Sequence, residues 1–155
     1  MPLSISLAVQ HSPVPMRLHA SCAARDACGV LLLGPSGSGK SDLLLRLLDR
    51  GFALVADDQV EVEDGIASAP AALAGLVEVR GLGIVRLPCI TAARLALAVR
   101  LRAPGERLPD AARPDPLLAV PCVALDPWTA SAPLRVSLAL DCALGRTAQV
   151  AGAFA

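Results

Sequence analysis

The chain has 155 residues and no net charge, and it is 54% hydrophobic but only 2% aromatic. This length suits one domain with an aliphatic core, so we expect residues 1–155 to form a single domain. The charge balance argues against a nucleic-acid binder that acts through a basic face. No apolar run reaches the ~18–20 residues of a membrane span.

Five cysteines are scattered along the chain without a C-x-x-C pair. An odd, dispersed set is typical of small buried thiols in a reducing compartment, not of a disulfide framework or a zinc site. The first 15 residues also lack the basic segment and apolar core of a signal peptide. We therefore expect a cytoplasmic protein.

The first predicted elements are strands. Residues 4–9 alternate weakly, whereas residues 16–24 alternate more clearly between apolar and polar side chains. A turn at residues 25–29 leads into a short apolar run at 29–33, which predicts a buried strand and an antiparallel hairpin. His19 lies on the polar side of the hairpin, where a lone histidine is more often a surface residue than a functional one.

The next segment fits the P-loop pattern G-x-x-x-x-G-K-[ST] at every fixed position. Its backbone N–H groups would cradle the phosphates of a nucleotide at a helix N-terminus, Lys40 would reach the β- and γ-phosphates, and the Ser41 hydroxyl would bind Mg²⁺. A Gly/Ser turn that binds nothing is the alternative. Helical spacing at residues 42–50, followed by Gly51, favours the P-loop. The candidate nucleotide-binding residues are Gly34, Pro35, Ser36, Gly37, Ser38, Gly39, Lys40 and Ser41.

Two adjacent acids, Asp57 and Asp58, separate a predicted strand at residues 52–56 from another at 59–63. The connection from Lys40 is compact, so the first of these strands can lie beside the strand that precedes the P-loop. A carboxylate at this place in a nucleotide enzyme binds Mg²⁺ or acts as a base. Paired acids also occur in polar turns, but the apolar flanks favour a site in which one acid holds Mg²⁺ and the other accepts a hydroxyl proton.

The following residues carry weaker patterns. Residues 67–77 predict a loop and a short helix, and residues 78–88 a shaped loop that presents Glu78 and Arg80. A surface turn with a Glu–Arg pair is the simpler interpretation of the second segment. Residues 95–101 alternate as a strand.

The last third of the chain begins with a proline-rich loop at residues 103–116, which contains Arg107. Residues 117–120 and 122–125 predict an edge strand interrupted by proline. Residues 135–140 predict either a last strand or the start of a terminal helix, and the final alanine-rich residues could be helical.

Taken together, these motifs resemble the catalytic domain of HPr kinase/phosphorylase, a bacterial serine kinase that acts on the phosphocarrier protein HPr. Four segments carry the resemblance: Leu18-His19-Ala20, the P-loop, residues 54–60, and the highly specific Glu78-Val79-Arg80-Gly81-Leu82-Gly83-Ile84. Glu106-Arg107-Leu108 is a weaker fifth match. The resemblance spans residues 18 to 140 and implies an α/β fold: a P-loop-containing mixed sheet with flanking helices and a phosphoenolpyruvate-carboxykinase-like nucleotide core. It also implies a homo-oligomer, commonly a hexamer.

The same resemblance implies roles for individual residues. Asp58, with Asp57 beside it, would take the proton from the serine hydroxyl of an HPr-type phosphocarrier of the bacterial phosphotransferase system. The cofactors would be ATP and Mg²⁺, with Ser41 and Glu78 at the metal. The implied catalytic residues are His19, Lys40, Asp57, Asp58, Arg80 and Arg107.

The chain departs from the family pattern in two ways. It has no room for the N-terminal regulatory domain of longer members, and it lacks the Pro-Gly-Arg-Asn-type segment expected near residues 120–127. These departures argue against phosphorolysis and sugar-phosphate control but leave the kinase reaction intact. Two alternatives stay open. The scarcity of aromatic residues speaks against a small-substrate P-loop kinase, and the retention of both acids speaks against a non-catalytic, ATP-binding regulatory partner of a sensor kinase.

Overall fold

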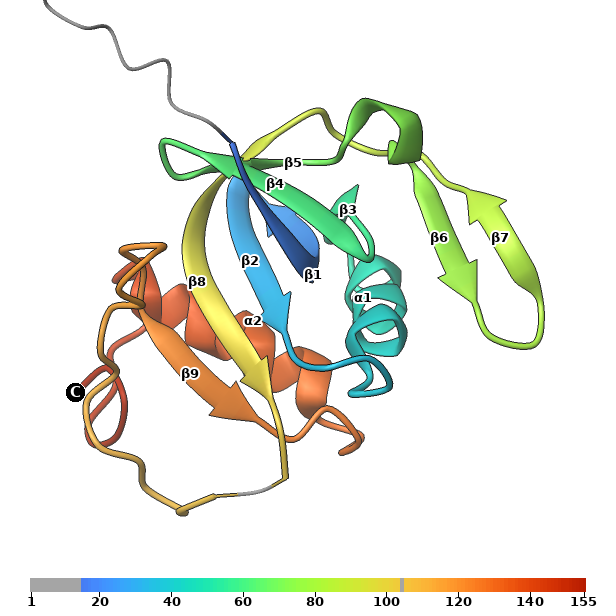
Figure 1. The fold of residues 1–155 in the computed structure, drawn as a ribbon. Helices are drawn as coiled ribbons and strands as arrows, with labels where there is room; N and C mark the ends of the chain where they lie inside the picture. The colour runs from blue at the N-terminus through green and yellow to red at the C-terminus, as the bar shows by residue number, and fades with distance from the viewer. Residues whose placement is uncertain (1–14, 104) are drawn as a thin grey trace, which may run out of the picture.

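The computed structural model describes residues 15–103 and 105–155, so the predicted strand at 4–9 lies outside the described residues (Figure 1). The α/β class is confirmed, with a mixed sheet and flanking helices. The elements are β1 (Met16–Arg25), β2 (Cys28–Leu33), α1 (Lys40–Asp49), β3 (Ala53–Ala56), β4 (Gln59–Glu63), β5 (Ile66–Ser68), the 3₁₀-helix η1 (Ala71–Leu73), β6 (Leu76–Val79), β7 (Gly83–Arg86), β8 (Ala93–Leu101), β9 (Cys122–Leu125) and α2 (Ala132–Ala143).

The predicted hairpin is confirmed, and its first strand is the centre of the sheet. β1 pairs antiparallel with β2, β3 and β4. The turn between β1 and β2 consists of Asp26 and Ala27, both with positive φ, as a tight two-residue hairpin turn requires. β2 also pairs in parallel with β8, which pairs with β5, so five strands close into a ring in the order β2-β1-β4-β5-β8. β9 extends the sheet beyond β8.

The prediction that the strand after α1 can lie beside the P-loop strand is wrong. β3 pairs with β1, and β1 therefore stands between β2 and β3. The helix-to-strand connection is short, but β1 is long enough to pair with β3 at one end and with β4 at the other. The acids after β3 consequently face the P-loop across β1.

Two apolar clusters hold the strands and helices together. The first packs Leu43, Leu44 and Leu47 of α1 and Val136 and Leu140 of α2 against one face of the sheet. The second uses alternate residues on the opposite face of β1 together with residues from the other ring strands, so it fills the interior of the ring. The period-2 pattern of residues 16–24 is thus satisfied on both sides of β1.

The hairpin of β6 and β7 forms its own two-stranded sheet beside α1 (Figure 1). The shaped loop expected over residues 78–88 is therefore wrong in its extent: within it, the turn between Val79 and Gly83 and residues 87–88 are irregular, and φ is positive at Gly81 and Gly83. In the preceding segment β5 forms a short strand where a loop was expected, and the predicted helix is limited to η1.

Residues 135–140, predicted as either a last strand or the start of a terminal helix, belong to helix α2. The predicted edge strand is confirmed only for β9, because residues 117–118 form a turn. The alanine-rich residues after Gly145, which could have been helical, form turns and bends.

All five cysteines are free, and burial raises the pKa of the Cys22 thiol to about 12. Within residues 15–103 and 105–155, no helix is long and apolar enough to cross a membrane.

Candidate active site

The glycine loop joins the end of β2 to the start of α1, as the P-loop pattern predicts. Gly39 precedes the helix with φ of 94°, a left-handed conformation that side chains rarely adopt. A Cβ at Gly34 would lie only 2.4 Å from the Ser38 hydroxyl oxygen, so a larger residue there would force the Ser38 side chain to move. The loop therefore has the shape of a phosphate cradle at a helix N-terminus.

Lys40 is the first residue of α1 and only 6% exposed. Its Nζ donates hydrogen bonds to the carbonyl oxygens of Gly34 (2.7 Å) and Pro35 (2.9 Å), on the rim of the loop. Burial lowers the pKa of the Lys40 ammonium below its usual value of 10.5, and the carboxylates of Asp58 and Asp57 oppose this shift. The loop thus holds a partly desolvated cation where phosphate oxygens would bind.

Asp57 forms the floor of the site and is 5% exposed. Its Oδ1 accepts hydrogen bonds from the hydroxyls of Ser41 (2.8 Å) and Ser21 (2.7 Å), and its Oδ2 accepts a longer one from the backbone N–H of Glu78 (3.4 Å). This single carboxylate connects the P-loop helix, β1 and β6. Three donors hold it in place, as expected for a group that orients a metal ligand.

Ser21 is the residue of this network that the sequence analysis missed. It lies on β1 and is fully buried, although the alternation placed it on the polar side of the strand. A signal was present, because Ser21 is two residues after His19 and so shares its face of β1. What the sequence did not show is that β3 lies beside β1 and brings Asp57 to this face.

Asp58 lies at the mouth of the site. Its side chain is 63% exposed, and its Oδ1 is 3.2 Å from Nδ1 of His19. Asp58 has a φ of 68° and lies in the irregular step between β3 and β4, which both run antiparallel to β1. The backbone is fixed there, since the Asp58 carbonyl accepts a hydrogen bond from the N–H of Ala20 at 3.1 Å. The predicted residues His19 and Asp58 are therefore brought together, beside the buried Asp57.

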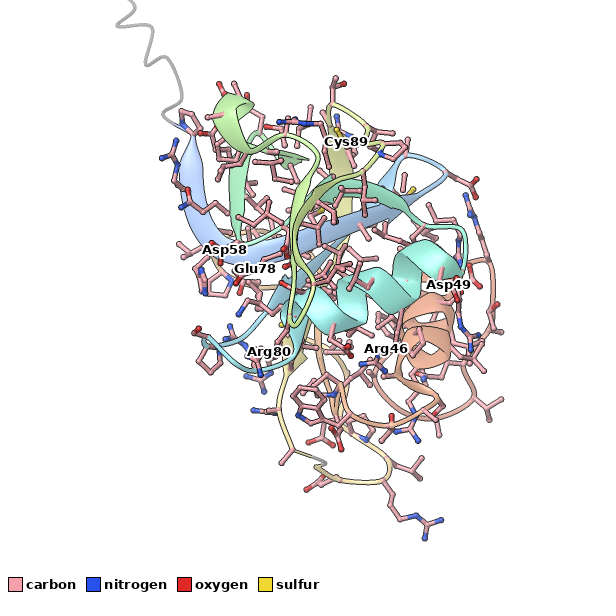
Figure 2. The ribbon with its side chains drawn as sticks, turned by 90° about the vertical axis from the view of Figure 1, so that its right-hand side faces the viewer. Arg46, Asp49, Asp58, Glu78, Arg80 and Cys89 are labelled. Carbon is pink, nitrogen blue, oxygen red and sulfur yellow. The ribbon has the colours of Figure 1, made fainter. Side chains whose placement is uncertain are left out.

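Glu78 and Arg80 project from the β6–β7 hairpin and are both exposed. Figure 2 shows both side chains with Asp58 near the N-terminal end of α1, opposite Asp49 at its C-terminal end. The bond from the Glu78 N–H to Asp57 holds the turn end of this hairpin against the site. Arg107 is different: it is exposed in the loop after β8, and among the described residues it forms no hydrogen bond or ion pair with the site.

The donor set fits Mg²⁺ with a nucleotide. Among residues 15–103 and 105–155, no group of three or more His, Cys, Asp or Glu side chains could hold a metal alone. Mg²⁺ commonly uses one or two carboxylates and takes its remaining ligands from water and substrate phosphates. The Ser41 hydroxyl and the Asp57 carboxylate offer oxygens of this kind beside the cradle, and Glu78 is adjacent, since its backbone N–H bonds to Asp57.

Strand β2, the glycine loop and helix α1, with Asp57 bonded to Ser41 at the start of that helix, define a P-loop domain. A family model described as the HPr Serine kinase C-terminal domain matches residues 14–94, slightly more than half of the chain, and the chain belongs to this family.

Individual relatives agree with this family. The chain is 42% identical over 78 residues to the HPr kinase/phosphorylase of Clostridium tetani, covering 48% of this chain and 26% of the relative. The corresponding protein of Clostridium novyi is 40% identical over 78 residues, with 48% and 25% covered. The chain thus spans about a quarter of the length of these curated relatives.

A solved structure extends the similarity beyond the matched segment. The Hpr(Ser) kinase/phosphatase from Coxiella burnetii superimposes with a TM-score of 0.68 and 28% identity, covering 79% of this chain and 87% of that one. This likeness supports the predicted fold class over most of the chain.

Proposed function

We propose that the protein is an ATP-dependent protein-serine kinase that phosphorylates an HPr-type phosphocarrier of a bacterial phosphotransferase system. The observation that carries this proposal is the pair of adjacent acids beside the glycine loop. One acid is buried and bonded to the P-loop serine, and the other is exposed at the mouth of the site. Family membership favours the same function and the same class of substrate.

The buried part of the site would bind ATP and Mg²⁺. Lys40 would exchange its bonds to the loop carbonyls for bonds to the β- and γ-phosphates, and the loop N–H groups would surround those phosphates. Ser41, with Glu78 and the Asp57 carboxylate nearby, would hold Mg²⁺, which neutralises charge on the phosphates. These residues do little covalent chemistry, since phosphoryl transfer depends mainly on positioning and charge neutralisation.

The exposed part of the site would act on the incoming serine. Asp58 would accept the hydroxyl proton as the serine oxygen bonds to the γ-phosphorus and the bond from that phosphorus to the β,γ-bridging oxygen breaks, releasing ADP. Its exposure lets a protein substrate approach, and His19 would fix its orientation. Arg80 would lie near the transferring group. Arg107 would join the site only through a rearrangement of its loop.

We propose that the protein acts mainly in the forward direction. The Pro-Gly-Arg-Asn-type segment is absent, and Asp126 occupies that region of the sequence. Its Oδ1 accepts a hydrogen bond from the backbone N–H of Trp128 at 3.0 Å. Attack by free phosphate on phosphoserine brings two anions together and requires added positive charge. A carboxylate has the opposite sign. Pyrophosphate release from serine-phosphorylated HPr in millimolar phosphate, at a rate comparable with the forward reaction, would contradict this direction.

The test of the main proposal is transfer of radiolabelled phosphate from ATP to purified HPr-type proteins. We expect Mg²⁺-dependent labelling of a serine, abolished when that serine is replaced by alanine. Binding of ATP without labelling would instead indicate a regulatory partner, and labelling of a sugar or nucleoside would indicate a small-substrate kinase. We also propose that the enzyme is cytoplasmic and forms a homo-oligomer, a hexamer by family resemblance. Light scattering of the same sample would test the oligomeric state.

A further inference from the structure

The loop between β9 and α2, residues 126–131, lies against the phosphate cradle (Figure 1). If Gly39 carried a Cβ, that atom would be 3.1 Å from Cζ2 and Cη2 of Trp128 and 3.4 Å from Cβ of Pro127. The edge of the indole therefore touches the cradle at the residue before Lys40. The absence of a side chain at Gly39 is what permits this approach.

The loop is anchored to α1, so the position of the indole is built into the fold. The guanidinium of Arg46 donates hydrogen bonds to the carbonyl oxygens of Thr129 (3.2 Å) and Pro127, and it forms an ion pair with Asp42 (2.9 Å). Although Arg46 holds the backbone of the residues before and after it, the Trp128 side chain is open to solvent, and the residue is 65% exposed. A large apolar ring is thus fixed at the edge of the cradle, with most of its surface open to solvent.

We infer that Trp128 is the stacking platform for the base of the bound nucleotide, an inference that rests on the proposed function. The cradle takes the phosphates, and the base of a nucleotide lies one ribose away from the α-phosphate, which places it at the mouth of the loop. Any nucleobase can stack on an aromatic ring, so this platform favours a base over bare polyphosphate without selecting strongly among bases.

A contact with a partner protein is the competing explanation for an exposed tryptophan. The position favours the nucleotide, because the ring touches the loop that would bind phosphate and is anchored through the same helix, α1. The other two aromatic residues do not offer such a platform: Phe52 is 6% exposed in the core, and Phe154 packs partly buried against it.

The sequence contains a single tryptophan, so intrinsic fluorescence reports on this residue alone. We expect Mg·ATP to quench the fluorescence of the unaltered protein, whereas Mg·tripolyphosphate, which lacks a base, leaves it nearly unchanged. By calorimetry, Trp128→Leu should weaken ATP binding about ten-fold without changing tripolyphosphate affinity. Trp128→Phe, which keeps a ring, should bind ATP within about three-fold of wild type. Leu134→Ala, an exposed apolar residue on α2, is the control and should bind both ligands normally.

Three outcomes would overturn the inference. The first is unchanged ATP affinity in Trp128→Leu, and the second is an equal loss for ATP and tripolyphosphate, which would mean that the ring only supports the loop. The third is normal ATP affinity combined with slower transfer to the phosphocarrier or a smaller assembly, which would mark a protein contact. If the wild-type protein shows the expected ATP binding but labels no phosphocarrier, the proposed kinase function fails and the base platform stands.

Discussion

Asp57 and Asp58 are neighbours of the same chemical type, yet they belong to different regions of the site. The buried floor contains Asp57, Ser21 and Ser41, and the Asp57 carboxylate is 5% exposed and held by three donors. The open rim contains Asp58, whose side chain is 63% exposed and contacts His19. The difference lies in what surrounds each carboxylate, because donors from β1, α1 and β6 enclose Asp57, whereas the Asp58 side chain lies at the surface beside His19.

This difference separates two tasks that one carboxylate could not perform equally well. A carboxylate held by several fixed donors keeps one orientation, which suits it to organise a cation and its ligands. A carboxylate in contact with solvent can meet a large substrate and exchange a proton with it. The contrast leads to four predictions, ordered from the largest expected effect to the smallest.

Replacing Lys40, the buried cation of the phosphate cradle, should have the largest effect. We expect Lys40→Ala to lose detectable ATP binding and phosphoryl transfer, because one charge and its contacts with the phosphates disappear. The fold should survive, since the substitution removes a partly desolvated cation. Calorimetric titration with Mg·ATP measures the effect. Arg50→Ala is the control, because Arg50 is an exposed cation at the other end of α1 and should leave binding normal.

The two acids should respond differently to the same conservative change. Asp58→Asn should keep ATP affinity but slow transfer about 10²–10⁴-fold, because an amide cannot accept the hydroxyl proton. Asp57→Asn should mainly raise the Mg²⁺ concentration needed for half-maximal transfer, because the floor loses its charge. Single-turnover transfer at several Mg²⁺ concentrations separates the effects. Near-normal transfer by both variants would refute the assignment, and interchanged effects would reverse the two roles.

The sequence predicted the parts of the fold that depend on local pattern. The hairpin, α1, β8 and the strands on both sides of the acids follow from alternation, helical spacing and glycine. The strand neighbours did not follow, because β3 pairs with β1 through contacts that no short window contains. The β6–β7 hairpin was missed for a related reason: its strands have four residues each, and its glycines suggested irregular structure throughout.

For the site, the P-loop motif was sufficient to predict the cradle, and the fold brings His19 and Asp58 to its mouth, where their predicted roles remain to be tested. The division of environment between the two acids was not predictable from the sequence, since it depends on contacts of Asp57 with residues distant in the chain, such as the buried Ser21. Trp128 was also missed, because it is about 90 residues from Gly39 in the chain and meets it only through the anchored loop.

Ser21 offers a smaller perturbation of the floor. Ser21→Ala removes one of the donors to Asp57, and we expect the free energy of unfolding to fall by about 1.5–3 kcal/mol, as for other hydrogen bonds to a charged group. Transfer at saturating Mg²⁺ should change little, because Ser41 still holds the carboxylate. Chemical denaturation and a Mg²⁺ titration measure the two effects. Ser137→Ala, which removes a bond from Arg25 to α2, should destabilise the protein without shifting the Mg²⁺ dependence.

The smallest predicted effect is the titration of Lys40, the single lysine of the sequence. Its pKa in the folded protein is lowered from 10.5, whereas the unfolded chain has the ordinary value. Between these two values the unfolded state binds more protons, so the contribution of Lys40 to the unfolding free energy rises with pH.

ATP should raise the pKa of Lys40, because phosphates favour the ammonium form, and ATP affinity should therefore fall as pH increases through the lowered pKa of the free protein. Biosynthetic labelling with ¹³C-lysine gives one side-chain signal, whose titration by NMR measures the pKa with and without a non-hydrolysable ATP analogue. We expect a midpoint below 10.5 that moves upward when the analogue binds. A midpoint at or above 10.5 in the free protein would show that the carboxylates on the floor and the rim outweigh the burial of the cation.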